Sequence, residues 1–244
     1  MKEVIRKLLI VICAIVFVYS AFQLGKIFYG YYKIEKDTNV MMEEYVQEEK
    51  QGEIFDPTKR DIDFKKLKGR NSDVVGWLYI PDTKIDEVLL KGDTNDTYLR
   101  SDIDKNYNYA GALFVDANNS SDLKDINTTI YGHNMKNGSR FHDLRYYVIE
   151  GSQYMDNHPF MYIYLPDGSV NIYEVFASAT IKDDSSLYNR SNDYSQYVKK
   201  VLSSSKYKKE VSDEQSPIIM LSTCHSSSED QRYVAFARLK ENLK

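Results

Sequence analysis

The segment PIIMLSTCHSSSEDQRYVAFAR, residues 217–238, contains two strand-like runs separated by a short polar loop. Side chains alternate between two faces up to Cys224, which predicts a buried strand with the cysteine at its end. Residues 225–231 are polar, and a second strand pattern starts at Arg232. If the two strands pair as a hairpin, Arg232 returns beside Cys224.

A thiol beside a guanidinium is well suited to acyl-transfer chemistry. Arginine stays charged, can stabilise a thiolate, and can donate hydrogen bonds to a developing oxyanion. The alternative interpretation of a lone cysteine is a small buried hydrophobic residue. The only other cysteine, Cys13, lies in an apolar run. A disulfide scaffold and a cysteine-rich zinc module are therefore both excluded.

An acid or base is also needed, and the chain has four histidines. In TTIYGHN, residues 128–134, His133 follows an apolar strand and a glycine, a usual position for a side chain that faces a cleft. His142 falls in a predicted helical turn, and His158 is expected at the surface. His225 adjoins the cysteine, but neighbours at a strand end point to opposite sides. We predict His133 as the partner, with His225 as its chief rival.

The remainder of residues 58–244 reads as a mostly β domain. A short helix is expected within residues 63–73, and a second one over 192–203, where apolar residues recur at helical spacing after a capping Asn192 or Asp193. Many short strands with few helices predict an antiparallel barrel or sandwich. The predicted strands are Val74–Ile80, Ile85–Leu90, Gly111–Val115, Thr128–Tyr131, Met161–Leu165, Val170–Ile181, Ile218–Ser222 and Tyr233–Leu239.

The N-terminal segment predicts a membrane anchor. Residues 8–25, LLIVICAIVFVYSAFQLG, carry no charge, and as a helix they rise about 27 Å, close to the hydrocarbon core of a bilayer. Basic residues before the span favour a cytoplasmic N-terminus and an external body. The alternative is a cleaved signal peptide. The predicted division is a cytoplasmic N-terminus at 1–7, a transmembrane helix at 8–25, a stalk at 26–57 and a catalytic domain at 58–244.

Charge and composition exclude other function classes. The formal net charge is −4. Residues 1–33 hold five Lys or Arg and one Glu, a net of +4, so the rest carries −8. Nucleic-acid binders usually have a basic footprint, so no nucleic-acid partner is expected. No two histidines have i, i+4 spacing and no acidic cluster is evident, so no metal site is expected either.

Together these segments resemble a class B sortase. The resemblance extends over roughly residues 60–240, with several motifs in the expected order. Met220 departs from the family's TLxTC-type motif, which has Thr there, and this change should affect packing more than chemistry. The similar segments are VVGWLYIPDTKID (74–86), NDTYLRSD (95–102), GALFVD (111–116), IYGHNMKNGSRF (130–141), MLSTC (220–224) and the arginine eight positions later.

The resemblance implies an eight-stranded sortase β-barrel with short N-terminal helices and one inserted helix, preceded by the single transmembrane helix. It implies a cysteine transpeptidase on the extracellular face of a Gram-positive cell membrane, with no cofactor. Cys224 would attack the threonine carbonyl of an NPxTN-like or xPxTG-like sorting motif in a secreted protein. His133 would protonate the departing amine, and Arg232 would stabilise the oxyanion. The thioester would then pass to a peptidoglycan stem or cross-bridge amine, or to a lipid-linked precursor.

Further residues are expected to line the peptide groove. Asn95 and Leu99 match groove positions of the class, although Asn95 could equally cap a turn and Leu99 could equally belong to the core. Ser222 and Thr223 adjoin the nucleophile. Tyr131 and the loop around Tyr188 would form walls.

Three alternatives remain. Pilus assembly is the first, but Asp56-Pro57 is followed by Thr58 rather than by the aromatic residue of the pilin-polymerising class. A papain-like hydrolase would place its cysteine at a helix N-terminus and before the histidine in sequence. A non-catalytic, membrane-tethered peptide-binding module would not need the three intact residues predicted for catalysis.

Overall fold

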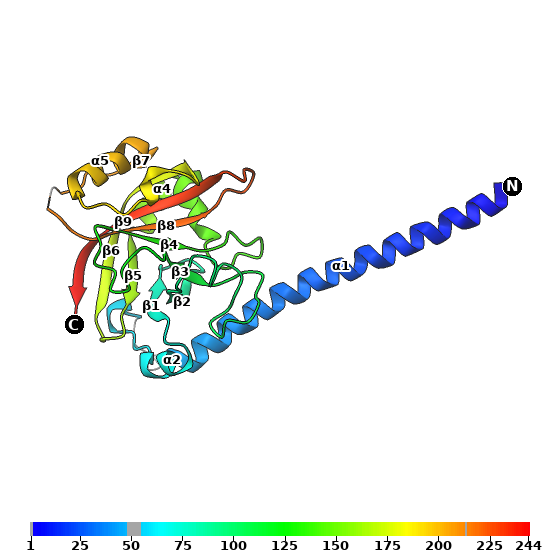
Figure 1. Ribbon diagram of the computed structural model, residues 1–244, viewed down its shortest axis with the longest axis horizontal. Helices are drawn as coiled ribbons and strands as arrows, with labels where there is room; N and C mark the ends of the chain where they lie inside the picture. Colours follow the sequence, from blue (N-terminus) through cyan, green and yellow to red (C-terminus); the bar gives the residue numbers. More distant parts are fainter. Residues whose placement is uncertain (1, 48–54, 213) are drawn as a thin grey trace. The chain divides into compact units, whose positions relative to one another are not determined.

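The computed structural model describes residues 2–47, 55–212 and 214–244 (Figure 1). The chain forms two compact units, Met1–Val40 and Met41–Lys244. Helix α1, Lys2–Tyr45, forms the first unit and continues into the second. Among the residues described, α1 is the one helix long and apolar enough to cross a membrane, judged by length and composition. The second unit begins upstream of the domain boundary expected at residue 58.

The second unit contains a closed eight-stranded β-barrel, which confirms the predicted fold class. Around the barrel the strands follow the order β5-β1-β2-β3-β4-β8-β9-β6, and β5 closes the circle by pairing with β6. A short strand, β7, pairs with β6 outside this circle. The strands are β1 (Val74–Tyr79), β2 (Asp86–Leu90), β3 (Leu113–Val115), β4 (Asn127–Tyr131), β5 (Phe160–Tyr164), β6 (Val170–Lys182), β7 (Tyr207–Lys208), β8 (Ile218–Cys224) and β9 (Gln231–Leu243).

The expectation of an antiparallel sheet is wrong for two strand pairs. Strand β2 pairs parallel with β3, and β4 pairs parallel with β8. A parallel pair needs a long crossover connection rather than a tight turn. The chain supplies one in residues 91–112 and another in residues 132–217, and both crossovers contribute walls to the site described below.

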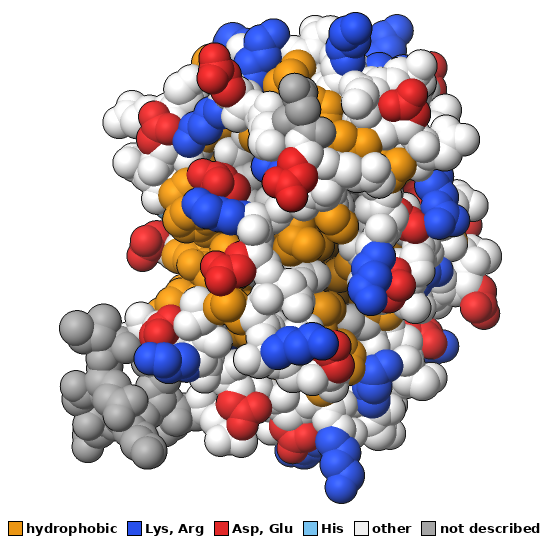
Figure 2. Space-filling view, turned by 90° about the vertical axis from the view of Figure 1, so that its left-hand side faces the viewer, with side chains coloured by type: hydrophobic (Ala, Val, Ile, Leu, Met, Phe, Trp, Pro, Cys, Tyr) orange, Lys and Arg blue, Asp and Glu red, His pale blue; other side chains and the backbone are white. Residues whose placement is uncertain are grey.

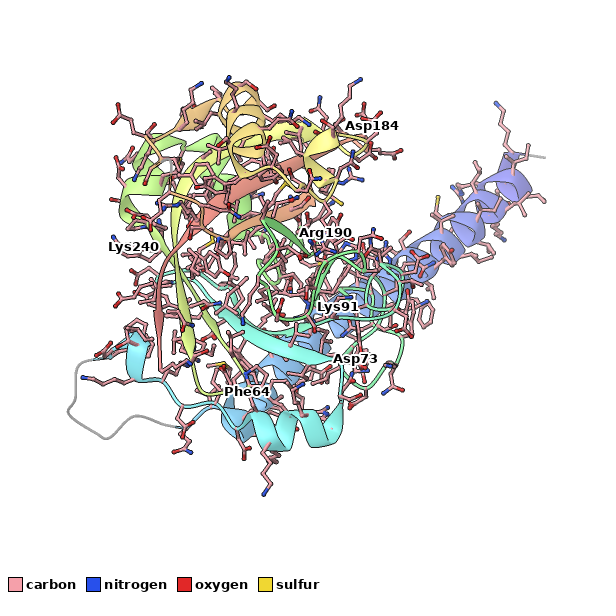
Figure 3. All side chains as sticks on the ribbon, turned by 60° about the vertical axis from the view of Figure 1, so that its left-hand side comes forward. Phe64, Asp73, Lys91, Asp184, Arg190 and Lys240 are labelled. Carbon is pink, nitrogen blue, oxygen red and sulfur yellow. The ribbon has the colours of Figure 1, made fainter. Side chains whose placement is uncertain are left out.

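Helices lie at the ends and on the outside of the barrel. In α2, Phe64–Arg70, the Asp63 carboxylate accepts from Lys66 N at 2.8 Å, and Phe64 (labelled in Figure 3) is buried. Asp193 caps α5 in the same way by accepting from Gln196 N at 2.9 Å, so Asp193 rather than Asn192 is the cap. The other helical segments are η1 (Pro57–Lys59), η2 (Asp143–Arg145), α3 (Tyr146–Ile149), α4 (Ser152–Asn157), η3 (Ser186–Tyr188) and α5 (Tyr194–Ser204).

Strand β8 is buried on both faces. Ile219 and Leu221 belong to the core inside the barrel, whereas Ile218 and Met220 pack in a second core that includes Tyr197 of α5. Met220 is fully buried, in agreement with a packing role for this departure from the family motif. Cys224 lies on the same outer face of β8 as Ile218 and Met220, because every second residue of a strand points to the same side.

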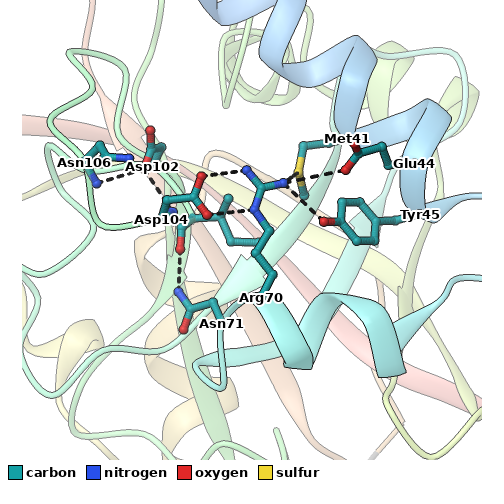
Figure 4. A network of polar contacts seen from close by, with 9 residues as sticks. Met41, Glu44, Tyr45, Arg70, Asn71, Asp102, Asp104 and Asn106 are labelled. Atoms are coloured by element: carbon teal, nitrogen blue, oxygen red, sulfur yellow. Dashed lines mark hydrogen bonds and ion pairs between the residues drawn. The ribbon is translucent and has the colours of Figure 1, made fainter.

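An arginine-centred cluster joins the end of α1 to the rest of the second unit (Figure 4). Arg70 binds Asp104 through two hydrogen bonds of 2.7 Å and donates to Tyr45 OH at 3.2 Å. Asp104 lies in the β2–β3 loop, residues 91–112. The cluster therefore holds that loop from the side of the N-terminal helix.

The surface carries mixed charge. On the face shown in Figure 2, Lys and Arg side chains are interspersed with Asp and Glu, and apolar side chains lie between them. Such a face presents no continuous basic stripe.

Candidate active site

Three neighbouring strands bring the predicted catalytic residues into one row. Cys224 ends β8, and Arg232 lies directly opposite it in the antiparallel β8–β9 pair. On the other side, parallel strand β4 places Tyr131 opposite Ser222. Two residues further along both chains come His133 and Cys224. Because residues opposite each other share a face of the sheet, the three side chains project from the same side of the barrel.

The chain leaves β4 in step with β8. Gly132 N donates to Ser222 O at 3.2 Å, which extends the ladder by one bond. Asn134 Nδ2 then donates to Cys224 O at 3.1 Å and to Ser226 Oγ at 3.3 Å. The backbone around His133 is thus tied to the strand of Cys224 on both sides. Asn134 was missed from the sequence, since its partners are about 90 residues away.

The three predicted catalytic residues and the six residues expected around the groove all line one cavity of about 270 Å³. The cavity lies at the ends of β4 and β8, between the β2–β3 loop and the segment that follows β6. None of the other three histidines lines it, and the His225 ring instead packs at a tilt against Tyr233, with ring centroids 4.3 Å apart. The lining residues are Asn95, Asp96, Leu99, Phe114, Tyr131, Gly132, His133, Asp183, Tyr188, Ser222, Thr223, Cys224 and Arg232.

The imidazole of His133 is held by one strong hydrogen bond. Its Nε2 lies 2.7 Å from Leu99 O, and because a carbonyl oxygen can only accept, Nε2 carries the hydrogen. Burial lowers the pKa of His133, and the positive charges of Arg100 and Arg140 lower it further, against the opposing effect of the Leu99 carbonyl. The neutral imidazole is thereby favoured, with Nδ1 free to exchange a proton.

This pKa gives a direct test of the electrostatics. Replacing Arg100 with glutamine removes a positive charge that disfavours the imidazolium, so the pKa of His133 is expected to rise. A ¹³C-edited NMR titration of the ring, assigned with a His133→Gln variant, measures the change. Arg238→Gln is the control, since Arg238 pairs at the opposite end of the β8–β9 hairpin. An unchanged or lower pKa in Arg100→Gln would contradict the assignment of this charge effect.

The loop that follows His133 is anchored deep in the domain. Phe141 N donates to His133 O at 2.9 Å and closes the segment on itself. The Arg140 side chain forms a buried ion pair with Glu87 of β2 and donates from Nε to Gly111 O at 3.0 Å. This pair connects the histidine loop with β2 and with the end of the β2–β3 loop.

Gly132 fits this position because it has no side chain. A Cβ there would lie 2.5 Å from Leu113 Cδ2 and 2.8 Å from the Phe141 ring, and both residues are fully buried. Gly132→Ala is therefore expected to lower the free energy of unfolding by about 1–3 kcal/mol through overpacking. Denaturant unfolding of the full-length protein measures it.

A second glycine provides the control of opposite sign. Gly69 lies in α2, and a Cβ there would meet no atom within 4 Å. Gly69→Ala is expected to raise the free energy of unfolding by about 0.5–1 kcal/mol, because alanine favours the helix. Equal changes in the two variants would show that the space around Gly132 does not matter.

One wall of the cavity is aromatic. The Tyr131 ring stacks on Tyr188 at 6.0 Å between centroids and contacts Phe114 at 5.3 Å. Tyr188 OH also lies 2.8 Å from Ser222 Oγ. Burial and the nearby Asp116 carboxylate raise the pKa of Tyr131, and burial raises the pKa of Tyr188. Both hydroxyls therefore stay neutral.

The segment that carries Tyr188 is fastened to β4. Arg190 (labelled in Figure 3) pairs with Asp125 at 2.6 Å, and Asn127 Nδ2 donates to Asn189 O at 3.1 Å. These bonds fix the wall at Tyr188, which the sequence indicated only as a loop.

The Asn95 amide and Leu99 come from the β2–β3 loop. Asn95 Nδ2 donates to Asp116 Oδ2 at 3.0 Å, and its Oδ1 accepts from Ala117 N at 2.8 Å. Asn95 therefore fastens the loop to the end of β3 while it lines the cavity. Leu99 is 39% exposed, so it does not belong to the core. Contact of either residue with a peptide stays a prediction.

Ser222 and Thr223 differ from Cys224 in exposure. Both are 2% exposed, whereas Cys224 is exposed with a free thiol. Within the described part of the chain, no group of three or more His, Cys, Asp or Glu side chains is arranged to hold a metal ion.

Comparisons with known proteins show which family this chain resembles. A family model described as Sortase domain matches residues 78–240. Sortase B of Listeria monocytogenes is 35% identical over 189 residues, which cover 74% of this chain and 72% of that protein.

Solved structures show the same similarity. Sortase B from Bacillus anthracis superimposes with a TM-score of 0.69 at 27% identity, over 85% of this chain and 97% of that one. A Streptococcus pyogenes class B sortase involved in pilus biogenesis superimposes with a TM-score of 0.66 at 23% identity, over 73% and 98% of the two chains. The latter likeness supports the fold alone.

Proposed function

Since the chain belongs to the sortase family and matches its class B members, we propose that it cleaves a C-terminal sorting motif after threonine and joins the protein to a peptidoglycan amine. The sorting motif would be NPxTN-like or xPxTG-like. The observation that supports this most is the row formed by His133, Cys224 and Arg232 on three paired strands at one cavity. Nucleophile, acid–base group and cationic donor are the three parts that acyl transfer needs.

In the first step Nδ1 of the neutral His133 takes the proton of the Cys224 thiol, and the resulting thiolate attacks the carbonyl carbon of the threonine. The carbonyl oxygen becomes negatively charged in the tetrahedral intermediate, and the Arg232 guanidinium donates to it. The C–N bond then breaks, and His133 supplies the proton that the departing amine takes. The products of this step are a Cys224 thioester and a released C-terminal peptide.

In the second step an amine attacks the thioester carbon. His133, neutral after the first step, takes a proton from that amine as the new C–N bond forms. The C–S bond breaks and Cys224 leaves as the thiolate. A peptidoglycan stem or cross-bridge amine, or that of a lipid-linked precursor, would serve as acceptor, and water would give hydrolysis instead.

A peptide assay tests the reaction. The full-length protein in detergent is incubated with NPxTN- and xPxTG-type peptides, with and without hydroxylamine or a diaminopimelate-type amine, and products are read by mass spectrometry. Cleavage after threonine, an adduct on Cys224 and faster release with amine are expected. A folded protein that gives no cleavage and no adduct with any peptide would overturn the proposal.

Pilus assembly is the second candidate, and a Streptococcus pyogenes class B sortase of the same fold is described as involved in pilus biogenesis. A reaction that joins one protein to another would need an amine of a protein as acceptor, such as a lysine side chain, rather than a peptidoglycan amine. Adding a lysine-containing peptide to the same assay separates the two, because a pilus-assembly enzyme would prefer it to the diaminopimelate-type amine.

We also propose that α1 anchors the protein in the cell membrane by a single pass at residues 8–25. The cytoplasmic N-terminus would be residues 1–7, the stalk 26–57, and the catalytic domain at 58–244 would lie outside. A membrane-impermeant maleimide applied to intact cells is expected to label Cys224 and not Cys13, which lies within the span. A Cys224→Ala variant, which should remain unlabelled, is the control. Labelling only after lysis would contradict this orientation.

A further inference from the structure

The guanidinium of Arg232 is fixed by three acceptors. Its Nη1 donates to Glu229 O at 2.7 Å and to Gln231 O at 2.8 Å. Its Nη2 donates to Asp183 Oδ2 at 3.2 Å, the one ion pair of Arg232 among the described residues. Two of the three acceptors are backbone carbonyls of its own loop, whereas the third is a side chain from another strand.

Asp183 reaches Arg232 because of the strand register. In the β6–β9 pair Ile181 lies directly opposite Arg232, and Asp183 follows two residues later, on the same face. Its backbone is held too, since Asp183 N donates to Asp230 O at 2.9 Å just beyond the end of β6. Asp183 and Arg232 both line the cavity.

These three hydrogen bonds leave some N–H groups of the Arg232 guanidinium unused. A guanidinium has five N–H donors in a plane. Both hydrogens of Nη1 and one of Nη2 are occupied, so Nε–H and the second Nη2 hydrogen are left for a substrate oxygen. A planar fork offers these donors in a useful direction only when its plane is fixed. The two carbonyls hold one end of the plane, and the Asp183 carboxylate holds the other.

We propose that Asp183 is a positioning residue that sets the plane of the Arg232 guanidinium for oxyanion stabilisation. This inference rests on the proposed transpeptidase function. Among the described residues, Asp183 has its side-chain hydrogen bond with Arg232 and none with the thiol or the histidine, so we infer that it acts through Arg232. Its own negative charge opposes an oxyanion. The carboxylate side chain is 46% exposed, however, so water screens its repulsion of the oxyanion. The hydrogen bond that orients the Arg232 guanidinium is affected less.

The expected effect falls on the chemical step. Asp183→Ala should lower kcat by about fivefold to tenfold, less than the loss of an oxyanion donor itself, because the two carbonyls still hold Nη1. KM should change little, since a contact made mainly in the transition state is weakened. Asp183→Glu keeps the charge and an acceptor, and should recover part of kcat.

The chain offers a matched control in the adjacent residue. Asp184 is also exposed and carries the same charge, and Figure 3 shows it on the turn after β6. It forms no hydrogen bond or ion pair with Arg232, so Asp184→Ala should retain wild-type kcat and KM.

The experiment compares full-length wild type, Asp183→Ala, Asp183→Glu and Asp184→Ala in detergent, with a sorting peptide that the wild type cleaves. The rate of Cys224 alkylation by iodoacetamide and the melting temperature show whether the site remains folded. The same Asp183→Ala change is then made in an Arg232→Lys background. There it should cost much less, because a point-charge ammonium has no plane to orient.

The outcomes separate this inference from the function. A wild type that forms no thioester would overturn the proposed function, and the inference with it. Wild-type turnover with equal kcat in Asp183→Ala and Asp184→Ala would overturn the inference alone. An undiminished cost of Asp183→Ala in the Arg232→Lys background would also overturn it, because Asp183 would then act through another group.

Discussion

Replacing Cys224 with alanine is expected to abolish the thioester and to lower turnover on the order of 10⁴-fold to 10⁶-fold, as loss of a covalent nucleophile does elsewhere. The two hydroxyls that precede Cys224 on β8 cannot replace the sulfur. Ser222 Oγ is buried and bonded to Tyr188, and Thr223 is buried as well. Turnover is measured by product formation, and the adduct by mass spectrometry of the intact protein.

Peptide binding should survive this change, because the walls of the cavity come from Tyr131, Tyr188 and the β2–β3 loop rather than from the thiol. Fluorescence anisotropy of a labelled sorting peptide measures it. Cys13→Ala is the matched control and should keep full activity. Turnover that persists in Cys224→Ala would contradict the role of Cys224 as nucleophile. A wild type that binds the peptide without turnover would favour the peptide-binding module.

Replacing His133 with alanine is expected to lower kcat by about 10²-fold to 10⁴-fold, the usual contribution of a general acid–base group. The departing amine is a poor leaving group unless it is protonated as the C–N bond breaks. The defect should therefore shrink with an analogue whose leaving group needs no proton, such as an activated ester of the same peptide. Single-turnover kinetics of thioester formation measure both.

The control for this variant is His225→Ala, which removes the rival histidine next to the nucleophile. His225 packs against Tyr233 and accepts from Ser227 N at 3.3 Å, outside the cavity. It should retain most of the wild-type rate. The assignment would be reversed if His225→Ala were the inactive variant. A defect of His133→Ala that stays the same with the activated ester would contradict the role of His133 as proton donor.

Much of this site could be predicted from local patterns. Strand alternation around residues 218–224 was sufficient to place Cys224 at a strand end, and the seven polar residues that follow predicted the hairpin that returns Arg232. The same alternation separated His133 from His225. Every predicted strand has a counterpart in the barrel, because each is a short run rich in apolar, β-branched or aromatic residues and bounded by turn residues.

What the sequence could not show are the pairings between distant segments. The parallel contact of β4 with β8, which sets His133 beside Cys224, joins residues about 90 apart and leaves no local signature. Asp183 and Asn134 were missed for the same reason. Their polar side chains are ordinary for loops, and only the tertiary fold reveals that they bond to Arg232 and to the strand of Cys224.

The position of β9 in the barrel has a consequence for how the chain folds. This last strand inserts between β8 and β6, which cannot pair with each other directly. Until residues 231–243 arrive, both neighbours present unpaired edges, the kind of surface on which chains aggregate. Barrel closure thus depends on contacts distant in sequence, which makes folding slow. A chain that stops before Gln231 would lack Arg232. Its sheet would also remain open, with unpaired edges on β6 and β8 that favour aggregation.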